Sequence, residues 1–206
     1  MDAISMYING EHGTTTPEEY LSFIEQPENK KSRYELVNGF IIIKMAGGAS
    51  FNHGRISRYI TKKIDDYLEG KQCEVIQDTN AYLFNEDQCD DINNCKHIFQ
   101  PDIMVGCDKS KMTGRGYEGT PEFVVEIISK TSFQRDYLGK LYMYTKYGVK
   151  EYWIVDLPRN KVTVYLNAGE PLPDVFKYTF DDEVPIKIFG DFSIDFKEIL
   201  KIVDKE

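Results

Sequence analysis

No run of about 18 consecutive apolar residues occurs in the sequence, and a helix that crosses a membrane needs a run of that length. The first residues, MDAISMYINGEH, also lack the basic start and the apolar stretch of a secretory signal. These two absences argue against a helical membrane protein. We therefore expect a cytoplasmic protein that has no contact with a membrane.

Cysteine is scarce, with four residues at irregular spacing. This number is too small for the disulfide framework of a small secreted protein, so we expect reduced thiols. Cys89, Cys95 and His97 form a C-x5-C-x-H string whose side chains are of the type that binds zinc. The spacing differs from that of common zinc fingers, which favours a polar loop with two incidental thiols over a zinc site.

Basic residues are outnumbered, with 25 Lys and Arg against 34 Asp and Glu, and the net charge is -9. Such a charge repels phosphate backbones at long range, whereas strong nonspecific DNA binders usually have a basic face. We therefore expect modest affinity for nucleic acid unless basic residues gather locally. The candidates for such a basic rim, each by itself more typical of a solvated surface, are Lys109, Lys111, Arg115, Lys130, Arg135, Lys140 and Lys146.

The sequence also contains no internal repeat, no low-complexity tract and no linker rich in Pro, Gly and Ser. Its 206 residues fit one domain, and the 41% of residues that are apolar can fill a sizeable core. We therefore expect a single domain over residues 1–206. Its core should span about 16–165, followed by a C-terminal β extension and a closing helix over about 166–206.

Helices are predicted where apolar residues recur at helical spacing or where a capping motif begins a helix. Thr16 and Glu19 are spaced as a capping box, with Pro17 at the first helical position, and predict a short helix to about Ile24. Further helices are predicted over residues 52–68, 133–147 and 196–203.

Strands are predicted where β-branched and aromatic residues cluster between turn residues. The pair Asn38-Gly39 lies between the runs RYELV and FIIIKMA and predicts a β-hairpin. The other predicted strands are CEVIQ, AYLF, HIFQPDIMV, FVVEIIS, EYWIVD, KVTVYLN, VFKYTF and PIKIF. The order of strands and helices indicates an α/β fold, in the form of an α+β arrangement in which helices flank a mixed sheet.

Two carboxylates occupy segments that should be buried. Glu126 lies within the strand FVVEII, where an unpaired buried carboxylate would cost several kcal/mol. Asp102 follows Pro101 in a second apolar segment, and the loop between the two segments is long enough for them to pair as neighbouring strands. Two adjacent carboxylates either share a proton or bind a cation. Oxygen ligands of this kind suit magnesium or manganese.

Lys140 is the candidate basic residue of this site. It lies one turn after Asp136 in the predicted helix 133–147, and an exposed ion pair between the two is the simplest interpretation. The helix nevertheless follows directly from the strand that carries Glu126. Lys140 could therefore also reach a water molecule bound to such a metal or, in a phosphodiester substrate, the phosphate at which the bond breaks.

Two further residues are secondary candidates. Glu35 alternates with Tyr34 and Leu36 in the first hairpin strand. It could complete a metal site, but a solvent position on an edge strand is equally consistent with the pattern. His53 precedes Ile56 at helical spacing and should face the core. Such histidines are more often structural than catalytic.

Aromatic residues are frequent in and after the predicted helix 133–147. They could stack on nucleobases, although aromatics at helical and strand spacing more often belong to a core or a dimer interface. Together with the lack of a second domain, they lead us to expect a homodimer. The residues are Tyr137, Tyr142, Tyr144, Tyr147, Tyr152 and Trp153.

Several motifs together resemble the PD-(D/E)XK nuclease superfamily and, within it, the large bacterial Uma-two group of predicted endonucleases. They are Gln100-Pro101-Asp102, Val125-Glu126-Ile127, Asp136, Lys140, GVKEYWIVD, YELVNG, His53 and SKTS. The resemblance runs from Thr16 to Tyr165. It implies a restriction-endonuclease-like core in which Asp102, Glu126 and the main-chain carbonyl of Ile127 bind magnesium or manganese.

The sequence departs from the superfamily at its lysine. The usual pattern places this lysine two residues after the acidic residue of the strand, but Ile128 occupies that position. The resemblance implies that a helix lysine takes over, which makes Lys140 the first candidate. Lys130 is the second, because strand alternation places it on the same face as Glu126.

These features predict a metal-dependent endonuclease that hydrolyses the phosphodiester bonds of nucleic acid, with DNA as the expected substrate. Two alternatives stay open. A catalytically inactive nuclease fold that binds nucleic acid or protein would be consistent with the acidic charge and the missing strand lysine. A phosphoesterase that acts on nucleotides would need no long basic surface.

Overall fold

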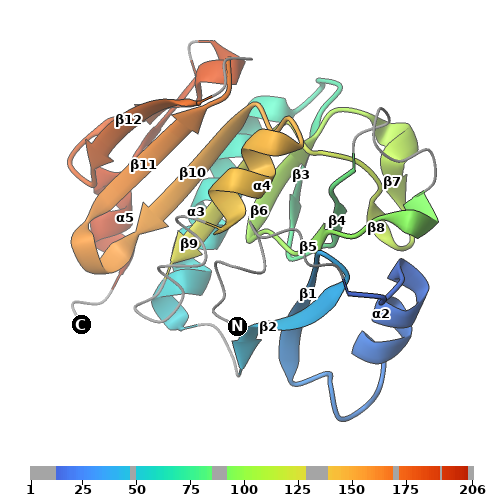
Figure 1. Cartoon of the computed structure of the whole chain (residues 1–206). Coiled ribbons are helices and arrows are strands. Elements are labelled where there is room, and N and C mark those ends of the chain that lie inside the picture. Colours follow the sequence, from blue (N-terminus) through green and yellow to red (C-terminus); the bar gives the residue numbers. More distant parts are fainter. Residues whose placement is uncertain are drawn as a thin grey trace.

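The computed structural model of the protein describes residues 13–46, 50–84, 92–128, 139–168, 172–190 and 192–203. The strands form two six-stranded sheets and a two-stranded sheet, and helices flank them (Figure 1). The predicted α/β class, with helices that flank a mixed sheet, is confirmed, although the strands divide among three sheets rather than one. Within the described ranges, no helix is long and apolar enough to cross a membrane.

The helices and strands have the following bounds. The α-helices are α2 Pro17–Ile24, α3 Phe51–Leu68, α4 Leu141–Lys146 and α5 Lys197–Ile202, and the 3-10 helices are η1 Ile92–Asn94, η2 Lys109–Lys111, η4 Leu157–Arg159 and η5 Lys187–Phe189. The strands are β1 Ser32–Val37, β2 Phe40–Ala46, β3 Glu74–Gln77, β4 Ala81–Tyr82, β5 Ile98–Phe99, β6 Ile103–Gly106, β7 Met112–Thr113, β8 Gly116–Tyr117, β9 Phe123–Ile128, β10 Glu151–Asp156, β11 Lys161–Leu166, β12 Asp174–Thr179, β13 Glu183–Pro185 and β14 Ser193–Asp195.

The main sheet has the strand order β12-β11-β10-β9-β6-β3. Its central strands β9 and β10 are parallel, and the other neighbours are antiparallel. Helices α3 and α4 lie on opposite faces of this sheet (Figure 1). On the α3 face, Ile56, Ile60 and Ile64 recur at helical spacing and pack with Val125 and Trp153. Because helices cover both faces, every residue of β9 is buried, including Glu126.

The second sheet has the order β2-β1-β5-β4-β8-β7 and packs on the α4 side of the main sheet. Its hairpin β1–β2 turns at Asn38 and Gly39, whose φ angles of 49° and 75° are those that a tight hairpin requires. On its other face, Leu36 and Ile98 pack against Tyr20 of α2. The predicted hairpin and the predicted helix 17–24, with its capping box at Thr16, are both confirmed.

One predicted strand is in fact two strands in two sheets. The segment HIFQPDIMV divides into β5 and β6, of which β5 joins the second sheet and β6 the main sheet. The break lies at Gln100-Pro101-Asp102, because Pro101 has no N–H group with which to continue a strand ladder. Asp102 therefore lies where the chain passes from one sheet to the other.

The C-terminal part extends the main sheet through β11 and β12. The predicted strand PIKIF is wrong, since Lys187–Phe189 form the 3-10 helix η5. The Glu151 carboxylate accepts a hydrogen bond from the Ile188 N–H (2.9 Å) and so ties this turn to β10. Of the predicted helix 133–147, the structure has α4 at Leu141–Lys146, and residues 133–138 lie outside the described ranges.

The expectation of reduced thiols is wrong for one pair. Cys73 and Cys107 form a disulfide across the end of the β3–β6 ladder, one position beyond the register pair Glu74 and Gly106. The buried thiol of Cys95 donates hydrogen bonds to the main-chain oxygens of Leu83 and His97 (3.5 and 3.1 Å). Cys89 lies outside the described residues, so the C-x5-C-x-H string is not tested as a zinc site.

The hairpin turn yields a stability prediction. A Cβ added at Gly39 would lie 2.4 Å from the carbonyl oxygen of Gly13, and the residue has a positive φ. We expect Gly39→Ala to lower the free energy of unfolding by roughly 1–3 kcal/mol. Gly54 of α3 has no neighbour within 4 Å of such a Cβ. Gly54→Ala should therefore leave the free energy of unfolding unchanged or raise it by about 0.5–1 kcal/mol. Urea unfolding of both variants checks this, and equal effects would contradict it.

Candidate active site

Five charged side chains meet in the space between the two sheets and α4, and we name Glu35, Lys44, Asp102, Glu126 and Lys140 the buried ionic cluster. Each is at most 9% exposed. Glu35 lies on β1 and Lys44 on β2 of the second sheet. Asp102 lies between β5 and β6, where the chain passes to the main sheet, and Glu126 lies on β9. Lys140 directly precedes α4. The cluster therefore joins elements that are far apart in the sequence.

Lys44 lies between the two acids of the main sheet. Its Nζ is 2.8 Å from Oδ1 of Asp102 and 3.3 Å from Oε2 of Glu126, and it donates a hydrogen bond to the carbonyl of Gln100 (2.5 Å). Burial lowers the pKa of an ammonium, but the neighbouring carboxylates outweigh burial and raise the pKa of Lys44. Lys44 is therefore charged and serves as a counter-ion to both acids.

Asp102 has a donor or cation at each carboxylate oxygen. Its Oδ2 accepts a hydrogen bond from the main-chain N–H of Ile127 (2.7 Å) and lies 3.1 Å from Nε2 of His53. Burial alone would raise the pKa of this carboxyl group, but Lys44 and His53 together hold it well below its usual range. By linkage, this ionised state stabilises the fold above the ordinary carboxyl pKa, and the stabilisation is lost as the pH falls below it.

Glu126 is held from the other side by Lys140. The Lys140 Nζ lies 2.6 Å from Oε1 of Glu126 and 2.8 Å from Oε1 of Glu35. The hydroxyl of Tyr144 donates to the same Glu126 oxygen (3.0 Å), and burial beside that carboxylate raises the tyrosine's pKa. The position and charge of Glu126 are thus defined by three neighbours.

The donor set of the cluster is compatible with a hard divalent cation. The three carboxylates of the cluster face the ammonium groups of Lys44 and Lys140. Carboxylate oxygens are the ligands that magnesium and manganese prefer. In the described part of the chain, however, no three His, Cys, Asp or Glu side chains are already arranged around a metal position. The Lys44 ammonium lies between Asp102 and Glu126 instead.

The structure brings together Asp102, Glu126 and Lys140, as the sequence predicts, and adds Glu35 and His53. Lys140 is fully buried, so its interpretation as an exposed ion pair is wrong, because α4 packs it against two carboxylates. Glu35 is also fully buried, and the solvent position is wrong because β1 lies between β2 and β5 rather than at an edge. His53 is the most exposed member of this group, with 12% of its side chain exposed.

The remaining predicted site residues have different outcomes. Lys130 lies outside the described residues, so its predicted role is not tested. The N–H of Ile127 contacts Asp102, and a ligand role for its carbonyl stays a prediction. In the proposed basic rim, Lys109 and Arg115 form surface ion pairs with Glu74 and Glu118, as expected of a solvated surface.

Sequence reasoning missed Lys44 altogether and considered Tyr144 only as a base-stacking, core or interface residue. A signal for Lys44 is present in the strand FIIIKMA. Strand alternation places it on the same face as Ile42, which packs against the core between the sheets. A lysine on such a face must find a carboxylate partner. The sequence contains no indication of which carboxylate that is.

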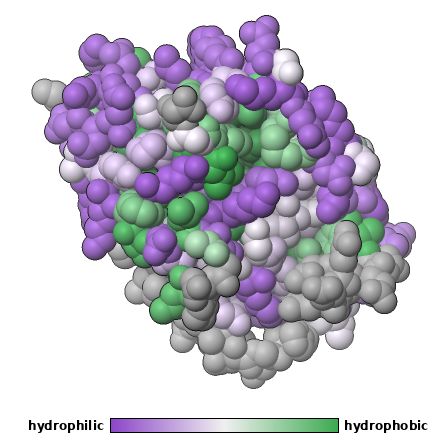
Figure 2. All heavy atoms as spheres, turned by 90° about the horizontal axis from the view of Figure 1, so that it is seen from above, coloured by the Kyte–Doolittle hydropathy of each residue, from purple (hydrophilic) through white to green (hydrophobic). Residues whose placement is uncertain are grey.

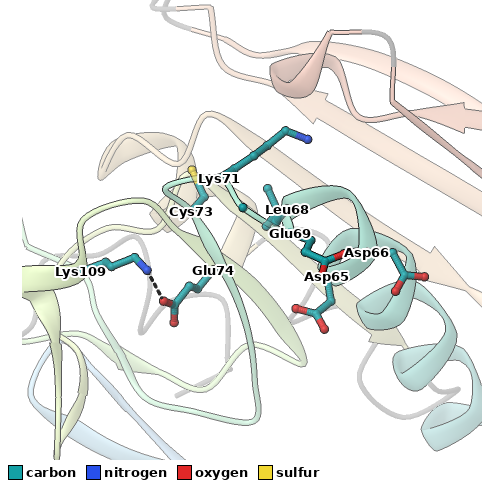
Figure 3. Close-up of a pocket in the computed structure, with 9 residues that line it drawn as sticks. Asp65, Asp66, Leu68, Glu69, Lys71, Cys73, Glu74 and Lys109 are labelled. Atoms are coloured by element: carbon teal, nitrogen blue, oxygen red, sulfur yellow. Dashed lines mark ion pairs between the residues drawn. The ribbon is translucent and has the colours of Figure 1, made fainter.

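A pocket of about 390 Å³ lies away from the cluster, at the C-terminal end of α3 (Figure 3). Its lining includes Asp65, Glu69 and Cys73, together with the ion pair of Lys109 and Glu74 (2.7 Å). His53, by contrast, is near the N-terminal end of the same helix, and 15 residues of helix separate His53 from Leu68 by about 22 Å. The pocket is therefore separate from the candidate active site.

Comparisons with known proteins agree with this architecture. A model of the Uma2 family, "Putative restriction endonuclease", matches residues 17–197, which include the whole buried ionic cluster. An uncharacterized protein from Synechocystis sp. is 26% identical over 182 residues, covering 87% of this chain and 89% of that protein. The crystal structure of a "putative nuclease belonging to DUF820" from Anabaena variabilis has a TM-score of 0.67 at 20% identity, covering 91% of this chain and 98% of that one. This last likeness shows a shared fold.

The burial of Lys140 yields a second prediction. Lys140→Met would leave two buried carboxylates short of a counter-charge, so we expect it to lower the free energy of unfolding by about 3–5 kcal/mol. Lys62 forms an exposed ion pair with Asp66 on α3, and Lys62→Met should cost less than about 0.5 kcal/mol. Chemical unfolding of the two variants compares them. Similar small losses would contradict a buried role for Lys140.

Proposed function

Because the chain belongs to the Uma2 family of restriction-endonuclease-like proteins, we propose that it is a metal-dependent endonuclease, with DNA as its expected substrate and the buried ionic cluster as its active site. The observation that carries the proposal is the shared contact of Asp102 and Glu126 with one ammonium group, Lys44. Carboxylate oxygens that converge on one cation are ligands of the type that magnesium and manganese prefer.

Asp102 and Glu126 would hold magnesium or manganese, with the carbonyl of Ile127 as the further ligand that the family implies. When bound, the metal would neutralise the phosphate and lower the pKa of water. The protein's own contribution is to fix the two carboxylates. The N–H of Ile127 holds Asp102, and Lys140 and Tyr144 hold Glu126.

Two residues would act on the reacting groups. In hydrolysis, the oxygen of water bonds to phosphorus, and the bond from phosphorus to the leaving oxygen breaks. His53 is the most solvent-exposed of these side chains and is oriented by Asp102; we propose that it accepts the proton released by the attacking water. Lys140 is fully buried, so its positive charge would stabilise the charge that develops on phosphorus without direct contact, in addition to positioning Glu126.

One observation favours a second candidate function. The Lys44 ammonium occupies the space between Asp102 and Glu126 and already satisfies both acids. A nuclease fold in this state would bind nucleic acid or protein without cleaving it. Nucleotides are an alternative substrate, because the net charge of -9 disfavours long polyanions more than small ones.

Cleavage assays test the proposed function directly. The purified protein should cleave plasmid DNA in the presence of magnesium or manganese, and EDTA should abolish the cleavage. We expect Asp102→Asn and Glu126→Gln to lose roughly 100-fold or more of the activity, because each removes a negative charge that the metal needs. Single-stranded DNA, RNA and nucleotides, tested in parallel, define the substrate.

A matched control separates the site from general charge effects. Asp66→Asn removes an exposed carboxylate from the surface of α3 and should retain full activity. Full activity of Asp102→Asn, or cleavage in EDTA, would refute the proposed site. Absence of cleavage on every substrate would support the inactive binding module.

A homodimer is also part of the proposal, although the aromatics that suggested it have other roles. Tyr144, Tyr152 and Trp153 are buried within the single chain, and Tyr142 is 44% exposed. On the face seen in Figure 2, hydrophobic side chains gather in patches that hydrophilic ones surround. Light scattering during size exclusion should give twice 23.9 kDa across a tenfold dilution. A mass of one chain would refute the dimer.

A further inference from the structure

We propose that the Lys44 ammonium and a divalent metal compete for the same carboxylate oxygens, so that metal binding displaces Lys44 from between Asp102 and Glu126. This inference rests on the proposed function, because it concerns the metal of that site. It adds that the metal affinity of the site is set by an internal cation.

The contacts of Lys44 place its charge where the metal would bind. Its Nζ lies 2.8 Å from Oδ1 of Asp102 and 3.3 Å from Oε2 of Glu126. A magnesium or manganese ion would have to approach the same carboxylates to about 2.0–2.6 Å. A dication and an ammonium that contact the same carboxylates would lie within a few Å of each other. They would repel each other strongly, because burial reduces the screening by solvent. The two cations therefore exclude one another.

Electrostatic repulsion favours the same outcome. A dication bound by Asp102 and Glu126 would add positive charge beside the carboxylates that Lys44 already contacts. Accumulating like charges in a buried site is costly. Withdrawal of Lys44 as the metal binds would relieve this repulsion.

Lys44 is the lysine that can withdraw. It lies on β2, an edge strand of the second sheet, and its side chain is 5% exposed. Lys140 has no exposed side-chain surface, contacts the carboxylates of Glu35 and Glu126, and lies 5.8 Å from the centre of the Phe99 ring. Metal binding should therefore move Lys44 and leave Lys140 in place.

Manganese titration of the full chain by calorimetry, without nucleic acid, tests the competition. Lys44→Met removes the competing charge but keeps an unbranched side chain, and should bind manganese at least about tenfold more tightly than the wild type. Lys44→Arg keeps the charge and should bind no more tightly than the wild type. Lys62→Met, which removes one positive charge from the surface of α3, controls for net charge and should leave the affinity unchanged.

An affinity of Lys44→Met equal to or below that of the wild type would overturn the inference, and so would an equal gain in Lys62→Met. The absence of manganese binding in all variants would overturn it as well. Because cleavage is not measured, a tighter Lys44→Met would support the inference even if no nuclease activity were found. Conversely, loss of activity in Asp102→Asn would support the proposed function even if Lys44→Met bound manganese unchanged.

A second measurement decides the question if Lys44→Met does not fold. The wild-type chain is acylated at its lysines with and without saturating manganese, and mass spectrometry reports the extent at each lysine. Manganese should raise the acylation of Lys44 severalfold, while Lys140 remains protected. Unchanged protection of Lys44 at saturating manganese would overturn the inference.

Discussion

The ammonium group of Lys44 connects the two sheets, because it extends from β2 of the second sheet to Asp102 and Glu126 of the main sheet. Lys140 makes the corresponding contact from α4 to Glu126 and Glu35. The arrangement of the acids therefore depends on how the two sheets and α4 pack together. Any change in the angle or register of β2 would move the counter-ion of both acids.

Burial of this many charges is tolerated because each carboxylate oxygen of Asp102 and Glu126 has a cation or a donor beside it. Such pairs seldom add stability over a well-packed apolar core, so a functional role is the more economical explanation for keeping them. Perturbed carboxyl and ammonium groups that are held by specific partners are typical of active sites. Membership of the Uma2 family is consistent with that interpretation.

Local sequence patterns predicted local structure well. The capping box at Thr16, the Asn38-Gly39 turn and the apolar stripe of α3 are determined by residues within one or two turns of each other. Predictions failed where a segment or side chain pairs with a residue that is far away in the sequence. HIFQPDIMV appeared as one strand, although its halves pair with different sheets, and Cys73 and Cys107 meet through a strand register that their spacing does not reveal.

For the candidate site, the sequence by itself determined that Glu126 is a carboxylate in a buried strand and that Asp102 follows a proline between two apolar segments. Both conclusions follow from residue type and from the apolar residues that flank each acid in the sequence. Only the tertiary structure decided that Glu35 and Lys140 are buried and that Lys44 lies between the acids. Alternation identifies the face on which a side chain lies, but what that face meets depends on how two sheets pack together, and no local pattern encodes such packing.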